Sequence, residues 1–414
     1  MTVAAPLPAA GLRARLSYPS GQEGRDQRFD FLRGYAMLSV IAAHLEMFSW
    51  FNFLFWERLG FVSAAELFVV ASGLVLGVVN RRVSDREGLE QVTVRALRRA
   101  FVLYRAQLIV ILLVMAIAAI GIADMTALTS FTDRWAGVTY TLTPDPGLPW
   151  MTQLGQAVLM QRSPHQIQIL SLYVLLLAVS PLLLWLLRMR MLGIYFALTW
   201  ALWFSELLAP PDRILLGMQF EFAFPLLGWQ VLFTHALAVG FFRAEIGAWL
   251  AQRGRGNLAV AVSIILALGF LVLAQASPNP SFPSWARLPL IDPDTFYSLY
   301  GRYFLKDELP LPRLLNVAVF FVSLYALLTW FWVPLSRALG WLLIPIGEAS
   351  LYVFLMHLLF IGLIDQLPGY FDGVPSFDAV WPGMIWVNTA LYLATVLGLW
   401  LMVRTRFLFA IVPR

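Results

Sequence analysis

Arg25–Leu45 reads RDQRFDFLRGYAMLSVIAAHL, and this stretch decides the fold. It starts with charged residues and continues as an apolar helix that carries a histidine well inside it. Arg33 and His44 are 11 residues apart, and at 100° per residue they return to within about 20° of one direction. The helix therefore places both side chains on one face, roughly 16 Å apart along its axis. One end of that face suits anion binding at a membrane surface, and the other suits acid–base chemistry inside.

The composition indicates a polytopic membrane protein. Of the 414 residues, 60% are hydrophobic and only 13% are charged, whereas soluble domains have about 25% charged residues. The chain has no cysteine, which excludes disulfides, thiol catalysis and thiolate metal sites. The net charge of +5 comes almost wholly from arginine, since Lys306 is the only lysine. That charge is distributed by membrane side, so it does not indicate nucleic-acid binding.

The hydrophobic pattern predicts an all-α bundle of about ten transmembrane helices. The first 28 residues contain no apolar core of signal-peptide length, so we expect a disordered cytoplasmic tail over 1–28. A single transmembrane domain should then occupy 29–405, followed by a short tail over 406–414. The predicted spans are 30–50, 60–80, 98–123, 166–187, 191–208, 223–242, 257–275, 314–333, 347–366 and 382–403.

The basic residues predict the orientation of this bundle. With the N-terminus inside, 20 of the 29 basic residues fall in inner segments and 8 in outer segments. This excess favours both termini in the cytoplasm. Two outer loops, about 124–165 and 276–313, are long, and loops of this length often carry function.

Two polar residues inside the spans predict an acid–base pair. His44 lies six residues before the outer end of the first span, and Glu66 lies six residues after the start of the second. At equal depth, a Glu66 carboxylate would accept a hydrogen bond from one imidazole nitrogen and leave the other as a base. The alternative is that Glu66 pairs with Arg58 or a loop amide. Gly73 and Gly77 share the Glu66 face in a spacing that permits close helix approach.

Other polar residues have two interpretations each. Arg105 either extends to the inner surface or faces a cavity as an anion partner, and His357 either makes a structural hydrogen bond or takes part in catalysis. Lys306 and Arg313 either belong to a solvated loop or receive a polar substrate outside. His165 and His235 are expected to be loop or packing residues. The four histidines have no metal-ligand spacing, so no metal site is predicted.

The pattern suits a donor with an anionic head and a long thin arm, such as a coenzyme A thioester. The head would lie at Arg33 and the inner arginines Arg98 and Arg99, and the arm would run up the bundle to His44. His44 would take the proton from an acceptor hydroxyl that arrives from outside. The competing class is a transporter or export permease, which would need a wider path and usually repeat symmetry.

The motifs resemble those of the acyltransferase-3 superfamily, and within it most closely the OpgC family of membrane succinyltransferases that modify osmoregulated periplasmic glucans. The resemblance covers about residues 25–405. It rests on Arg25-Asp-x-Arg-Phe-Asp-Phe-Leu-Arg-Gly34, Arg33-x10-His44, Glu66-Leu-Phe-Val-Val-Ala-Ser72-Gly73, Arg98-Arg99 through Tyr104, Ile169-Leu-Ser-Leu-Tyr173 leading to Pro181, Phe224-Pro225 with Trp229-Gln230, and Gly347-x-x-Ser-Leu-Tyr-x-Phe-x-x-His357.

This resemblance implies an inner-membrane enzyme that moves an acyl group from cytoplasmic acyl-CoA to a glycan hydroxyl outside. His44 matches the catalytic histidine and Arg33 the paired arginine, while Asp30, Glu66, Ser72 and Arg105 match or neighbour typical polar positions. The acyl group could be succinyl or acetyl, and the acceptor could be another glycan, a lipid or a small molecule. A succinyl carboxylate needs a cation in the pocket, for which Arg105 is the candidate.

Overall fold

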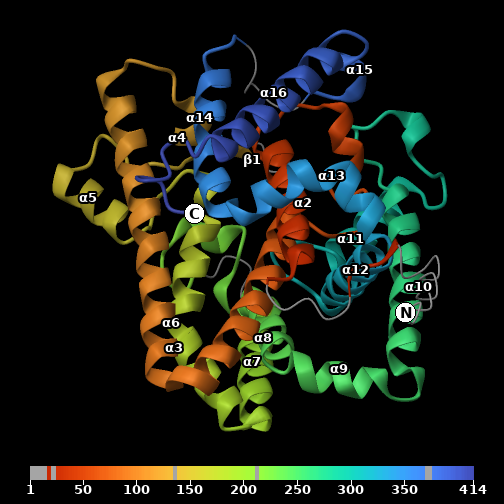
Figure 1. The fold of residues 1–414 in the computed structure, drawn as a ribbon. Coiled ribbons are helices and arrows are strands. Elements are labelled where there is room, and N and C mark those ends of the chain that lie inside the picture. The colour runs from red at the N-terminus through yellow and green to blue at the C-terminus, as the bar shows by residue number, and fades with distance from the viewer. Residues whose placement is uncertain (1–15, 20–24, 134–137, 210–213, 369–374) are drawn as a thin grey trace, which may run out of the picture.

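The computed structural model describes the whole chain except residues 1–15, 20–24, 134–137, 210–213 and 369–374. The described residues form a bundle of α-helices with one two-stranded antiparallel hairpin (Figure 1). The helices are α2 (Gln27–His44), α3 (Ala64–Ile120), α4 (Thr126–Thr129), α5 (Trp150–Val158), α6 (Ile169–Arg188), α7 (Leu192–Leu207), α8 (Leu226–Phe241), α9 (Arg243–Ala251), α10 (Arg255–Gln275), α11 (Pro293–Tyr303), α12 (Leu311–Trp330), α13 (Trp332–Glu348), α14 (Ser350–Asp365), α15 (Phe377–Val380) and α16 (Met384–Arg404). The strands are β1 (Ser130–Asp133) and β2 (Val138–Thr141), and short 3-10 turns are η1 (Trp50–Leu54), η2 (His165–Ile167), η3 (Gln219–Phe222), η4 (Gln252–Gly254) and η5 (Ser284–Ala286).

Each of the ten apolar runs contains helix over most of its length, but α2 ends at His44, before the end of the first run, and α3 begins only at Ala64. The second and third runs lie in one 57-residue element, α3, which is broken at Gly88. Gly88 has a φ of 84° and a ψ of 176°, a conformation that a residue with a Cβ rarely adopts. The break lies in a polar segment between two apolar helical halves. The hydrophobic pattern therefore predicts the two halves, but it does not predict that they form one almost continuous helix.

Five helical segments among the described residues are long and apolar enough to cross a membrane. A sixth candidate is the pair α13 and α14, which is bent by 92°. Helix α13 was not predicted as a separate element, because Arg337, Pro345 and Glu348 interrupt its apolar pattern. In Figure 1 it lies across the bundle, while α14 stands upright.

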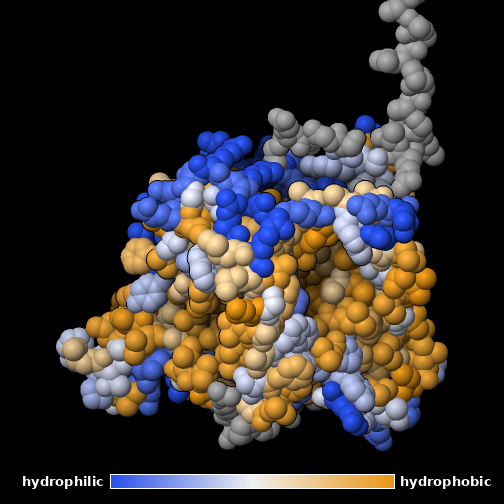
Figure 2. Space-filling model, turned by 90° about the horizontal axis from the view of Figure 1, so that it is seen from below, coloured by the Kyte–Doolittle hydropathy of each residue, from blue (hydrophilic) through white to orange (hydrophobic). Residues whose placement is uncertain are grey.

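The outside of the bundle is apolar, as expected for contact with lipid. Helix α10 stands at one edge of the bundle (Figure 1), and Ala274 is its one buried residue. Figure 2 shows a face that is largely hydrophobic, with most of its hydrophilic residues along the top margin and smaller hydrophilic groups at the lower edge. An apolar surface with polar margins is the pattern of a membrane-spanning protein.

Glycines set the closest helix contacts. A Cβ at Gly73 would lie 2.5 Å from the Phe233 carbonyl oxygen of α8, and one at Gly77 would lie 2.2 Å from the Leu237 oxygen. Both distances are far below van der Waals contact, so the predicted close approach at Gly73 and Gly77 is confirmed. Helices α2 and α13 also pack with backbone contact, at Gly34.

The predicted tail over 1–28 lies largely outside the described residues. Within it, the Tyr18 amide donates a hydrogen bond to the Thr329 carbonyl oxygen at 2.8 Å, and helix α2 begins at Gln27. The basic residues Arg13, Arg15, Arg134 and Arg213, used for the orientation, also lie outside the described residues.

Candidate functional site

A cavity of about 390 Å³ runs along helix α2 and is lined by the two residues that the helical spacing placed on one face. Arg33 and His44 both line it, together with Arg99, Ser72 and Lys306. The walls come from α2, both halves of α3, α6, α8 and α14, with loop residues at the His44 end. The common face predicted for Arg33 and His44 is therefore one wall of a real cavity.

Arg33 occupies one end of this cavity. One of its terminal nitrogens, Nη2, donates a hydrogen bond to Ser350 Oγ at 2.6 Å. Its Nε is buried and has no hydrogen-bond partner among the described residues. A guanidinium with a buried, unused donor is suited to a phosphate or carboxylate of a bound molecule.

His44 pairs with a second histidine from α14. His44 Nδ1 lies 2.9 Å from His357 Nε2, and His357 Nδ1 lies 2.5 Å from the Phe354 carbonyl oxygen. A carbonyl oxygen only accepts, so His357 Nδ1 carries the hydrogen, and with neutral rings its Nε2 accepts from His44 Nδ1. His44 Nε2 is then left with a free lone pair, as a general base requires.

The predicted pair of His44 with Glu66 is not formed. Glu66 accepts hydrogen bonds from Arg313 Nε at 2.6 Å and Nη2 at 3.0 Å, and from the Ser63 amide at 2.6 Å. Glu66 and Arg313 are both completely buried. The loop-amide alternative is thus correct in part, and Arg313, 247 residues away, takes the role that His44 was expected to have.

Arg313 is consequently not free to receive a substrate. It also pairs with Glu57 Oε1 at 2.5 Å and hydrogen-bonds the Phe304 carbonyl oxygen. Since a buried cation with this many bonds is committed to the fold, we assign Arg313 and Glu66 to holding the start of α3 against α12.

Three further predicted residues lie away from the cavity. Arg105 and Arg98 are exposed on α3 and do not line it. Asp30 is buried, but Arg25 Nε donates to its Oδ2 at 2.7 Å, and it does not line the cavity either. Arg105 therefore cannot hold an acyl carboxylate at His44, because its side chain is on the outside of the bundle.

His165 and Glu46 belong to the site. The expectation that His165 is a loop or packing residue is therefore incomplete, and the sequence alone does not single out Glu46. The His165 ring lies edge-on to His44, with ring centroids 5.9 Å apart, and it lines the cavity. Its Nε2 lies 3.3 Å from Glu46 Oε1. Glu46 has a φ of 51°, which is uncommon for a residue with a side chain. No spacing in the sequence joins these residues; the polar pair His165-Gln166 before an apolar span was the only signal.

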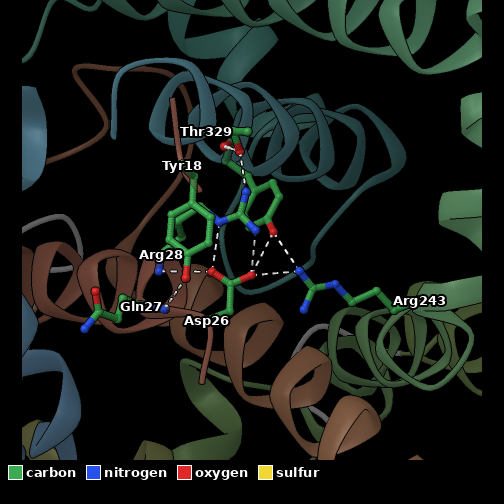
Figure 3. A network of polar contacts seen from close by, with 7 residues as sticks. Tyr18, Asp26, Gln27, Arg28, Arg243 and Thr329 are labelled. Carbon is green, nitrogen blue, oxygen red and sulfur yellow. Dashed lines mark hydrogen bonds and ion pairs between the residues drawn. The ribbon is translucent and has the colours of Figure 1, made fainter. Parts of the chain in front are cut away.

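Helix α2 is anchored at its N-terminal end by a polar network (Figure 3). Asp26 pairs with Arg28 at 2.8 Å and with Arg243 at 2.7 Å, and Tyr325 donates to it at 3.0 Å. Arg28 also donates to Thr329 Oγ1 at 2.7 Å. These bonds join α2 to α9 and α12 and so fix the helix that carries Arg33 and His44.

The charge on Asp26 is stabilised by this network. Burial disfavours its carboxylate, but the hydrogen bonds from Arg28 and Arg243 outweigh burial and lower its pKa to about 2. Asp26 therefore remains ionised at any pH at which the protein works.

Comparison with known proteins gives one match. A family model described as OpgC protein matches residues 25–410. The comparisons with curated proteins and with solved structures found no match. The matched segment is nearly the whole chain and contains every element that lines the cavity. By this match, the chain belongs to the OpgC family.

Proposed function

We propose that this chain is an inner-membrane O-acyltransferase with about ten spans and both termini in the cytoplasm. It takes an acyl group, which we expect to be succinyl, from cytoplasmic acyl-CoA and places it on a hydroxyl of a periplasmic glucan. Membership of the OpgC family, which suggests a glucan-modifying acyltransferase, supports the class of reaction. The observation that carries the mechanism is one cavity that joins Arg33 to His44.

The donor lies along this cavity in the proposal. Arg33 and Arg99 line the same wall region and would hold the phosphates, since charge-assisted hydrogen bonds to guanidinium are strong. The pantetheine arm then extends along α2 and brings the thioester to His44, over the roughly 16 Å that separate the two residues along the helix.

The transfer step uses the free nitrogen of His44. His44 Nε2 takes the proton of the acceptor hydroxyl while the hydroxyl oxygen forms a bond to the thioester carbonyl carbon. The carbon–sulfur bond breaks, and the CoA thiolate takes the proton back from His44 and leaves as the thiol. His357 keeps the His44 ring oriented and accepts from its Nδ1–H throughout.

The test is label transfer by purified protein in detergent. Radiolabelled succinyl-CoA or acetyl-CoA is offered with a β-glucan acceptor, and CoA release is followed in parallel. We expect His44→Ala to lower transfer by about 10²–10⁴-fold, the range of general-base catalysis.

The matched control is His235→Phe. His235 lies on α8, where its Nδ1 is 2.8 Å from the Val231 carbonyl oxygen and its ring packs on Trp200, away from the cavity. This variant should transfer normally. A wild-type protein that binds neither thioester would overturn the proposal and favour the export permease.

A further inference from the structure

Lys306 is a cation in the His44 cavity for which the mechanism above has no role. It lies between α11 and α12, is partly buried and is the only lysine of the chain. Its Nζ lies 4.7 Å from the Phe224 ring centroid, a cation–π contact. Lys306 lines the same cavity as His44, and its charge acts on that histidine.

Lys306 forms no ion pair with a carboxylate in the part of the chain that the structure describes. Glu57, Glu66 and Asp307 attract Lys306 and Arg313 repels it, but Arg313 already binds Glu57 and Glu66. Burial lowers the pKa of Lys306, with partial compensation from Glu66. A desolvated ammonium without a counter-ion is costly, and a bound anion removes that cost.

The anion must come from a molecule that occupies the cavity. The CoA phosphates are assigned to Arg33 and Arg99, and a glucan hydroxyl is neutral. The remaining group at His44 is the acyl chain itself. The alternative cation, Arg105, is excluded because it lies on the outside of α3.

We propose that Lys306 binds the free carboxylate of a short dicarboxylic acyl group while its thioester lies at His44. Lys306 thereby selects a charged acyl donor over a neutral one of similar size. This inference rests on the proposed function, since it assigns the substrate class of the same site.

The experiment compares two donors in Lys306→Met, a variant that keeps an unbranched side chain of similar length and removes its charge. Transfer to the β-glucan is measured with succinyl-CoA and with acetyl-CoA. We expect kcat/KM for succinyl transfer to fall about 10- to 100-fold, as for loss of a charge-assisted bond. Acetyl transfer should stay within about threefold. Lys306→Arg should recover part of the preference, and Arg105→Met should leave both donors unchanged.

The outcomes separate this inference from the one on which it rests. If the wild type transfers neither group, the proposed function fails. If the wild type is active and Lys306→Met loses both donors equally, Lys306 serves the fold or the acceptor, and the inference is overturned. An unchanged ratio of succinyl to acetyl transfer would overturn it as well.

Discussion

At the scale of single residues, His357 is the one whose role changed most between sequence and structure. The sequence left it between a structural hydrogen bond and catalysis. The structure places it behind His44, 2.9 Å away and outside the cavity lining. In the proposed mechanism it is therefore a positioning residue, which fixes the tautomer of His44 and does not contact the substrate.

We expect His357→Phe to impair transfer and His357→Gln to preserve most of it. Phenylalanine leaves His44 Nδ1–H without an acceptor, at a cost of about 1–3 kcal/mol, or about 5- to 150-fold in rate. The glutamine carbonyl can stand where Nε2 stood and accept the same bond. Steady-state kcat at saturating donor measures the difference. Wild-type activity of His357→Phe would show that the Nδ1 contact is not needed.

At the scale of elements, the sequence predicts well those features that depend on residues within a single helix. The 3.6-residue period placed Arg33 and His44 on one face of α2, and the spacing of Gly73 and Gly77 predicted close packing of α3. Both follow from helix geometry alone. The pairs that the sequence does not predict join distant segments: His44 and His357, beside the cavity, are 313 residues apart, and Glu66 and Arg313, which hold α3 against α12, are 247 apart. The equal depth of His44 and Glu66 in their spans predicts that they pair. In the structure, Glu66 instead pairs with Arg313, which carries a full positive charge and donates two hydrogen bonds to it.

The stability of helix α2 depends on the network around Asp26 at its N-terminal end. We therefore expect the stability of the protein to depend on pH. The pKa of Asp26 is about 2 in the folded protein against an ordinary value of 3.8. Because the pKa is lowered in the folded protein, ionised Asp26 stabilises the fold at pH values above its ordinary pKa. This stabilisation is lost as the pH falls toward 2.

We therefore expect Asp26→Asn to lower the thermal midpoint in detergent at neutral pH, because Arg28 and Arg243 lose their shared carboxylate. The difference in thermal midpoint between the variant and the wild type should become smaller below pH 3.8. Thermal unfolding at a series of pH values measures it. A difference that stays constant down to pH 2 would contradict the assigned role of Asp26.

At the scale of the whole molecule, the proposed topology places residue 90 in the cytoplasm and residue 294 outside. Both Glu90 and Asp294 are exposed, and the natural chain has no cysteine, so a single introduced cysteine reports without background. We expect a membrane-impermeant maleimide to label Asp294→Cys in spheroplasts. Glu90→Cys should react only after permeabilisation. Labelling of both positions from one side would contradict the ten-span arrangement, since five predicted spans separate them.

The central claim is that one cavity binds the donor at Arg33 and performs the chemistry at His44. Its most direct test measures the dissociation constant of CoA and the single-turnover transfer rate for Arg33→Gln and His44→Gln side by side. The account predicts that His44→Gln binds CoA within about threefold of wild type and loses transfer by about 10²–10⁴-fold. Arg33→Gln should weaken CoA binding by about 10-fold or more. Normal CoA binding by Arg33→Gln, or normal transfer by His44→Gln, would contradict the account.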